Sequence, residues 1–170
     1  MGIPSVSLST PPMDFEDLVG RNIRIRRIEV DPGSREFELL VQMYLDLSGQ
    51  SRSMGIPPVG DDAIKDWLVD LGDGIHLVAW FDDSVVGHAT LLPDGRGSYE
   101  LAIFVHQDYQ QAGIGTELLR TLLGAGEEEG VELVWLTVST GNAVAKRLFQ
   151  SAGFSVTNRS RRQLEMELIL

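Results

Sequence analysis

The feature that most constrains this sequence is a short stretch with two glycines, placed between a strand-like run and a helical pattern. The apolar residues 101–105 precede it, and leucines at helical spacing, beginning with Leu118, follow it. The first N–H groups of a helix have no partner within the helix, and the helix dipole makes that end positive. Because Gly113 and Gly115 carry no β-carbon, the oxygens of a ligand can approach the main chain closely. The junction therefore predicts a phosphate-binding site.

The pattern of the glycines excludes two common nucleotide-binding loops. The third position of the dinucleotide motif G-x-G-x-x-G is Leu118 here, and no Gly-Lys-Ser/Thr follows as it would in a Walker loop. From the glycines alone, a phosphate loop and an ordinary turn both remain open.

Two blocks of residues together narrow the choice. The first, Q-x-x-G-x-G at residues 110–115, resembles the Q/R-x-x-G-x-G/A signature of the GNAT acyltransferases, which move acetyl from acetyl-CoA to an amine. The second, N-x-x-A-x-x-x-F-x-x-x-G-F at residues 142–154, resembles the N-x-x-A-x-x-x-Y-x-x-x-G-F helix of the same superfamily. The blocks stand in the expected order, and the motif resemblance covers about residues 97–158. It implies acetyl-CoA as the donor substrate and an amine as the acceptor.

Hydrophobic periodicity and turn residues give an element order that agrees with this resemblance. Strands are expected at residues 22–30, 75–81, 85–92, 98–105, 131–138, 154–158 and 163–170, and helices at 32–47, 61–71, 113–129 and 142–152. The expected fold class is α/β (α+β), with a GNAT-type mixed, mostly antiparallel central sheet of about seven strands and about four helices on both faces. One GNAT domain is expected at residues 21–170, after a flexible N-terminal extension at residues 1–20. Asp31 is expected to cap the first helix, and Gly124 and Gly126 to weaken the third.

The chain is strongly acidic, with a formal net charge of −11 and a sequence pI of about 4.6. This balance argues against a nucleic-acid partner, whose phosphates favour a basic face, and it is compatible with a cationic acceptor. Only Lys65 and Lys146 are lysines, so twelve of the 14 cations are arginines. Excess carboxylate with scarce lysine resembles proteins from salt-loving microbes. Habitat and substrate both stay open as explanations of the charge, and habitat is favoured.

Composition also bounds the location and the chemistry. No apolar run approaches the roughly 18 residues needed to cross a bilayer, and no leader is recognisable, so we expect a cytoplasmic protein without a membrane partner. The absence of Cys excludes disulfides, thiolate metal sites and a Cys nucleophile. His76, His88 and His106 lack the spacing of metal ligands, and His106 is expected to be a solvated turn residue.

Acyl transfer to an amine requires a base, because an ammonium group is not a nucleophile. Glu100 is the candidate base, since it lies in an otherwise apolar strand where partial desolvation would raise the pKa of its carboxyl. Members of the superfamily often carry a glutamate base on this strand. The alternative is that Glu100 pairs with an arginine at the sheet surface or is simply exposed.

The resemblance also implies a set of coenzyme-binding residues. Phe104 and Val105 would offer main-chain groups to the pantetheine arm, and Asn142 would contact the coenzyme or cap its helix. Phe149 replaces a frequent Tyr that can act as an acid, so the thiolate would leave unassisted or with help from water, Ser139 or Thr140. The expected coenzyme-binding residues are Phe104, Val105, Gln110, Gln111, Ala112, Gly113, Ile114, Gly115, Thr116, Asn142 and Phe149.

Two functional hypotheses follow. The first is an acetyl-CoA-dependent N-acetyltransferase working by direct attack in a ternary complex, with a protein lysine or N-terminus slightly favoured over a small amine. The alternative is an acyl-CoA-binding sensor without turnover, supported by Phe149. The long loop at residues 48–60 is expected to help shape the acceptor site, and the terminal hairpin makes a homodimer a further expectation.

Overall fold

A mixed sheet of eight strands organises the computed structural model, which describes residues 7–49 and 56–170. The strand order is β1-β2-β3-β4-β5-β6-β8-β7, and every neighbouring pair is antiparallel except β5–β6. The strands are β1 (Met13–Glu16), β2 (Asn22–Ile28), β3 (Ile75–Phe81), β4 (Ser84–Pro93), β5 (Tyr99–Val105), β6 (Leu133–Ser139), β7 (Ser155–Arg159) and β8 (Gln163–Ile169).

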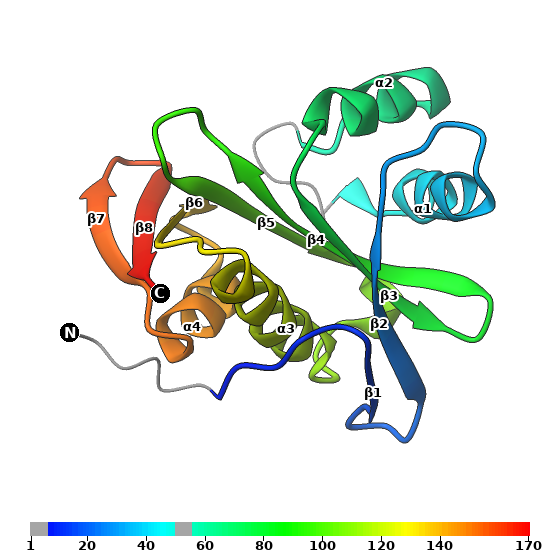
Figure 1. Ribbon diagram of the computed structural model, residues 1–170, viewed down its shortest axis with the longest axis horizontal. Coiled ribbons are helices and arrows are strands. Elements are labelled where there is room, and N and C mark those ends of the chain that lie inside the picture. The colour runs from blue at the N-terminus through cyan, green and yellow to red at the C-terminus, as the bar shows by residue number, and fades with distance from the viewer. Residues whose placement is uncertain (1–6, 50–55) are drawn as a thin grey trace.

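Four α-helices cover the two faces of this sheet. They are α1 (Arg35–Leu45), α2 (Asp61–Leu71), α3 (Ile114–Glu128) and α4 (Ala143–Ser151), with a short 3₁₀ helix, η2 (Gln107–Tyr109), after β5. Helices α1 and α2 lie over β3 and β4 on one face, and α3 and α4 lie on the other (Figure 1). Each face buries its own apolar cluster. The arrangement confirms the expected fold class, with one strand more than the seven expected.

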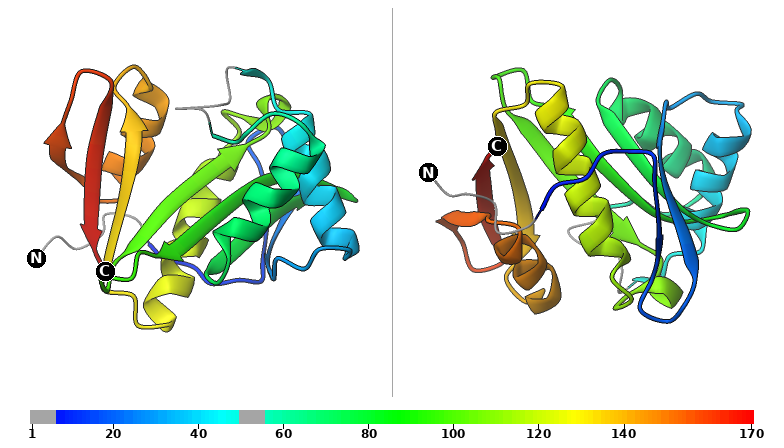
Figure 2. Two further views of the ribbon diagram at one scale, coloured as in Figure 1. Left: turned by 90° about the horizontal axis from the view of Figure 1, so that it is seen from above. Right: turned by 60° about the horizontal axis from the view of Figure 1, so that its bottom comes forward.

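The additional strand lies inside the segment that the sequence assigned to a flexible extension. Met13–Glu16 forms the edge strand β1 on β2, and residues 7–12 form a strap across α3 (Figure 2, right). The Ser9 N–H donates to the Arg120 carbonyl, and the Arg120 Nε donates to the Ser7 carbonyl. A β-carbon on Gly124 would lie 1.8 Å from the Ser9 oxygen. The glycine expected to weaken the helix is therefore the position that lets the strap approach it.

The start of α1 also differs from the expectation. Ser34, not Asp31, is the N-cap, and its hydroxyl accepts from the Phe37 N–H at 3.1 Å. Gly33 adopts a left-handed φ of 93°, which ends the extended chain before the helix begins. Helix α2 has Gly60 as its N-cap, and Asp61 and Asp62 occupy its first turn, where carboxylates interact favourably with the helix dipole.

A chain of buried polar groups connects the helices on the α1–α2 face to the sheet. His76 Nε2 lies 3.2 Å from the Gly72 carbonyl, His76 Nδ1 lies 3.2 Å from His88 Nε2, and His88 Nδ1 lies 2.5 Å from the Tyr44 hydroxyl. A carbonyl only accepts, so His76 Nε2 must carry a proton. In the neutral state of both rings, His88 Nε2 then donates to His76 and the Tyr44 hydroxyl donates to His88. The chain joins α1, β4, β3 and the end of α2 with each of these groups satisfied.

This polar chain predicts how stability depends on pH. Burial lowers the pKa of His88 to about 3, and the neighbouring His76 adds to the shift. Below pH 6.5, His88 is protonated in the unfolded chain but stays neutral in the folded protein. The stabilisation that the neutral ring contributes above that pH is therefore lost as the pH falls from 6.5 toward 3. Between pH 7.5 and pH 5, the loss in unfolding free energy should be about 2 kcal/mol smaller in His88→Gln than in the wild type. Urea unfolding at the two pH values measures this, and equal losses would contradict the buried neutral ring.

The strap predicts contrasting effects of two alanine substitutions in α3. Gly124→Ala should lower the unfolding free energy by about 1–3 kcal/mol, because the new methyl collides with backbone atoms of Ser9. In Gly126→Ala the nearest atom is the flexible end of Leu91, so the change should stay within about 1 kcal/mol. Urea unfolding compares the two variants, and hydrogen exchange should show increased exchange at the Ser9 amide in Gly124→Ala alone. Equal exchange in both variants would mean that the strap does not depend on this glycine.

Candidate functional site

The candidate site is the gap that opens where β5 and β6 separate. Within the described residues the two strands are in register only at Tyr99 with Val134 and at Glu100 with Trp135. Beyond these pairs they diverge, and a cavity of about 540 Å³ lies between the end of β5, the start of α3 and helix α4. A gap of this kind in a sheet leaves main-chain groups available to a ligand.

The direction of the main chain along β5 decides which residues face this gap. Residues of a paired antiparallel strand turn their N–H and C=O groups alternately toward and away from the neighbouring strand. The His106 N–H donates to the Val86 carbonyl on β4, so the groups of Phe104 also face β4, while those of Ile103 and Val105 face β6. All three strand residues line the cavity. Val105 therefore stays among the residues whose main chain faces the gap, and Ile103, which the sequence interpretation missed, joins it. The main chain of Phe104 instead faces β4 inside the sheet.

The loop before α3 has the form expected of an anion-binding helix start. Gly113 is the N-cap with a left-handed φ of 88°, no side chain caps the first turn, and Gln111 also has a positive φ of 57°. Gln110 donates from its side-chain amide to the Val105 carbonyl at 2.9 Å, which ties the loop to the end of β5. Gln110, Gln111 and Gly115 line the cavity.

The other expected residues of this loop lie beside the cavity without lining it. The side chains of Ala112 and Ile114 are buried in the core, and Thr116 is exposed on α3. Ala112 and Ile114 could serve a ligand only through their main chain.

Helix α4 forms the opposite wall of the cavity. Asn142 caps the helix by accepting from the Ala145 N–H at 3.0 Å, and it also lines the cavity, so both of its expected roles are compatible. Phe149 lies at the cavity wall, 8% exposed, and packs edge-to-face on Phe154.

Of the two hydroxyls considered as proton donors, one lines the cavity. Ser139, at the end of β6, belongs to the lining. Thr140 is not part of it, because its hydroxyl donates to the Arg161 carbonyl at 3.1 Å in the β7–β8 turn. Sequence patterns could not separate these two adjacent residues.

Glu100 stands at the apex of the gap, at the last register pair before the strands separate. Leu101 is in the cluster under α3, so strand alternation places Glu100 on the opposite face, toward α1 and α2. The residue is exposed, and partial burial of its carboxyl raises its pKa, with the nearby Asp94 carboxylate adding to the shift. No arginine forms an ion pair with Glu100 in the part of the chain that the structure describes.

The loop expected to shape the acceptor site is described only in part, because residues 50–55 lie outside the described residues. Its first residues are fixed to the segment after β5. The Ser48 N–H donates to Gln107 Oε1 at 3.0 Å, and Gln107 Nε2 donates to the Asp46 carbonyl at 2.8 Å. His106, expected to be solvated, is only 6% exposed and contacts the Asp46 carboxylate at 2.7 Å. That expectation was wrong because Asp46 lies 60 positions away in the sequence.

Residues 7–49 and 56–170 contain no helix with the length and apolar character needed to span a membrane. They also contain no group of three or more His, Asp or Glu residues placed to hold a metal ion.

Comparisons with known proteins agree with this geometry. The model of the acetyltransferase (GNAT) family matches residues 41–154. The chain is 43% identical over 53 residues to the [ribosomal protein bS18]-alanine N-acetyltransferase of Escherichia coli, which covers 31% of this chain and 36% of that protein. It is 35% identical over 83 residues to the mycothiol acetyltransferase of Mycolicibacterium vanbaalenii, covering 47% of this chain and 26% of that protein. The matches thus span about a third or less of these relatives' length.

Solved structures show the same fold over nearly the whole chain. The GNAT domain of S. lividans PAT superposes with a TM-score of 0.79 at 20% identity, covering 93% of this chain and 96% of that one. The PaiA N-acetyltransferase of Thermoplasma acidophilum, solved in complex with coenzyme A, gives 0.68 at 18% identity, covering 87% and 99%. With the family model matched over most of its length, this chain belongs to the GNAT acetyltransferase family.

Proposed function

We propose that this protein is an N-acetyltransferase that transfers acetyl from acetyl-CoA to an amine by direct attack in a ternary complex. The observation that carries the proposal is the gap between β5 and β6, which has an uncapped helix start at one end and Glu100 at its apex. The relatives named above are a [ribosomal protein bS18]-alanine N-acetyltransferase and a mycothiol acetyltransferase, and one solved neighbour is in complex with coenzyme A.

The cavity suggests a placement for each part of the donor substrate. The first N–H groups of α3, around Gly113 and Gly115, would bind the pyrophosphate. The main-chain groups of Ile103 and the N–H of Val105 would bind the pantetheine arm, completing the hydrogen bonds that β6 does not supply. The apolar side chains of Leu148 and Phe149, which line the cavity, would exclude water from the pantetheine arm. The acetyl group would then approach the apex of the gap.

Glu100 would act as the base, because its raised pKa improves its ability to take a proton. The acceptor ammonium loses a proton to this carboxylate, directly or through a water. The freed nitrogen then forms a bond to the acetyl carbon, the carbon–sulfur bond breaks, and the second proton of the nitrogen passes to the departing thiolate, directly or through a water. A thiol with a pKa near 8.5 is a tolerable leaving group at neutral pH, and Ser139, which lines the cavity, would assist it. A Cys-linked acyl-enzyme is excluded because the chain has no Cys.

The second candidate is an acyl-CoA sensor that binds without turnover. Phe149, which has no hydroxyl to act as an acid, favours it, and Glu100 at the apex argues against it. Coenzyme A release across a panel of amines separates the two. A sensor would be stabilised against heat by acetyl-CoA and would release no thiol in response to any amine.

The proposal includes finer expectations from the sequence. The acceptor is proposed to be a protein lysine or N-terminus in preference to a small amine, and the location cytoplasmic. The acidic surface is proposed to be an adaptation to salt, and the terminal hairpin a surface through which two copies could pair.

Coenzyme binding at the start of α3 is tested by Gly115→Ala. The ideal β-carbon has its nearest neighbour, Leu148, at 3.7 Å, so the fold should accept it and gain up to about 1 kcal/mol of helix propensity. The methyl would occupy the space through which phosphate oxygens approach. Loss of charge-assisted hydrogen bonds of about 1.5–3 kcal/mol should raise the Kd for coenzyme A about 10- to 100-fold, measured by calorimetry. Gly49→Ala, with open space around its β-carbon, is the control; unchanged affinity in Gly115→Ala would place the coenzyme elsewhere.

The role of Glu100 is tested by Glu100→Gln, which keeps the shape and removes the base. We expect kcat/KM to fall about 10²- to 10³-fold. In the wild type, activity should fall as the pH drops through the raised pKa of Glu100, because the protonated carboxyl cannot accept a proton. That acid limb of the pH–rate profile should be absent from the variant. Glu132→Gln, at an exposed glutamate before β6, is the control; an unchanged acid limb in Glu100→Gln would show that another group is the base.

A further inference from the structure

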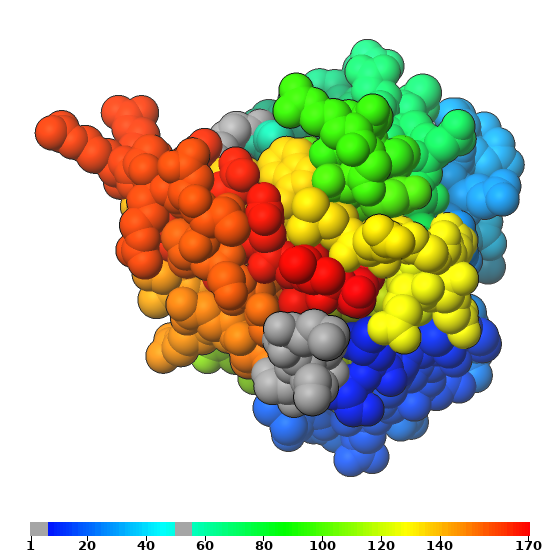
Figure 3. Space-filling view, turned by 60° about the vertical axis from the view of Figure 1, so that its left-hand side comes forward, coloured from blue at the N-terminus to red at the C-terminus, as the bar shows by residue number. Residues whose placement is uncertain are grey.

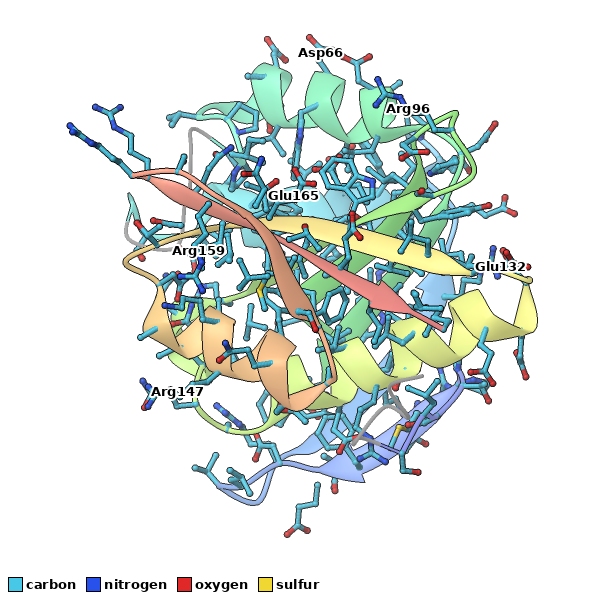
Figure 4. All side chains as sticks on the ribbon, turned by 90° about the vertical axis from the view of Figure 1, so that its left-hand side faces the viewer. Asp66, Arg96, Glu132, Arg147, Arg159 and Glu165 are labelled. Atoms are coloured by element: carbon cyan, nitrogen blue, oxygen red, sulfur yellow. The ribbon has the colours of Figure 1, made fainter. Side chains whose placement is uncertain are left out.

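Cations without an ion-pair partner are concentrated at one end of this acidic molecule. Most described arginines and lysines lie within 4.0 Å of a carboxylate. In the described chain, the cations outside these pairs are Arg96, Lys146, Arg147, Arg159, Arg161 and Arg162. Arg147 and Arg159 lie at the same end of the molecule, and Arg96 lies away from them (Figure 4). An unpaired cluster of one sign in a chain of net charge −11 creates a local field opposite to that of the remaining surface.

Three of these residues form what we call the arginine turn: Arg159 at the end of β7, and Arg161 and Arg162 in the turn before β8. The turn is ordered by its own hydrogen bonds, from the Ser160 N–H to the Gln163 carbonyl at 2.9 Å and from the Gln163 N–H to Ser160 Oγ at 3.1 Å. The three arginines are exposed, and the segment projects from the body of the molecule (Figure 3). A fixed backbone that presents three unpaired guanidinium groups is suited to binding carboxylates.

The arginine turn is attached to the rim of the candidate site. The Thr140 N–H donates to the Arg162 carbonyl at 3.0 Å, and the Thr140 hydroxyl donates to the Arg161 carbonyl. Thr140 lies between Ser139 and Gly141, and both of these residues line the cavity. The turn therefore lies next to the end of the gap between β5 and β6.

The sheet face that leads from the turn to the apex has the opposite charge. Leu164, Met166 and Leu168 are buried in the core, so Glu165 and Glu167 lie on the opposite face, which is the face of Glu100. Cross-strand register aligns Glu100 with Trp135 and Trp135 with Glu167. Glu165 extends on the α2 side of the sheet (Figure 4). The inner part of the face therefore favours a cation, and its outer end favours an anion.

The distance between these two regions sets the spacing of charges in a complementary ligand. Glu167, at the level of Glu100, is five residues from Arg162 along β8. At about 3.3 Å per residue this is roughly 16 Å, the length of about five residues of an extended peptide.

We infer that the acceptor is an extended peptide segment with acidic residues about four to six positions from the amine that is acetylated. This inference rests on the proposed function and specifies its substrate class. The ammonium group would approach the carboxylates near the apex, and the acidic residues would reach the arginine turn. The net charge of the chain alone would favour the opposite, a uniformly basic acceptor.

The test compares matched peptides with two triple variants. Three peptides are compared, each with its amine at the N-terminus or on a lysine. The first has glutamates about four to six positions from the amine. The second has glutamines at the same positions, and the third has its glutamates next to the amine. Arg159→Gln/Arg161→Gln/Arg162→Gln removes the arginine turn. Arg24→Gln/Arg26→Gln/Arg35→Gln makes the same change in net charge at arginines of β2 and the start of α1. Binding is measured by fluorescence anisotropy with coenzyme A present, and turnover by thiol release.

We expect the wild type to bind the correctly spaced acidic peptide at least about tenfold more tightly than the other two, with a preference that weakens as salt increases. The arginine-turn variant should lose this preference and keep its kcat on the glutamine peptide, and the control variant should keep both. Equal binding of all three peptides by the wild type would overturn the inference. The inference would also be overturned if both triple variants lost the preference for the acidic peptide equally, or if removal of the arginine turn changed the oligomeric state.

Binding and turnover separate the two proposals. If the peptides bind with the expected dependence on spacing but none of them causes thiol release, the transferase proposal is refuted. The inference that the arginine turn binds acidic residues would then still stand. Thiol release without any preference for acidic peptides would leave the transferase intact and remove the proposed specificity.

Discussion

Strands β5 and β6 stay paired for only two residue pairs before they separate. A sheet that opens in its interior leaves N–H and C=O groups without strand partners, and buried groups of this kind require others. Strand β6 stays paired with β8 along its whole length, so it continues beside β8 after it separates from β5. Helix α3 begins just beyond the end of β5 with uncapped N–H groups. One interrupted ladder thus leaves strand amides and uncapped helix amides beside one cavity, and Glu100 occupies the last paired position of the ladder.

Much of this arrangement could be predicted from the sequence because its determinants are local. The glycines of residues 113 and 115, the apolar run before them and the helical leucines after them are contiguous, so the strand–loop–helix unit was correctly predicted. The positions of α2, β3 and α4 also followed from nearby caps and periodicity. The family resemblance had its basis in two such contiguous blocks, and the match of the family model confirmed it.

The features that were missed depend on contacts between distant parts of the chain. Strand β1 has a sequence of mixed polarity, and its pairing with β2 is visible only in three dimensions. The contact of His106 with Asp46, and the polar chain from Tyr44 to Gly72, join residues that no spacing rule relates. Which main-chain groups of β5 face the gap depended on its register with β4, which the sequence pattern leaves undetermined. Ile103 was overlooked for that reason.

The strap across α3 has a consequence for how the chain is made. Ser7 accepts a hydrogen bond from Arg120, which follows it by 113 residues, so the strap has no binding surface until α3 has been synthesised. Strand β2 likewise has no pairing partner on its inner edge until β3 has been synthesised. Contacts of such long range slow folding, because the entropy of closing the loop is lost before the contact is gained. The amino-terminal edge of the sheet should therefore be among the last parts of the molecule to become protected, and the nascent chain would depend on its net negative charge to remain separate from its neighbours.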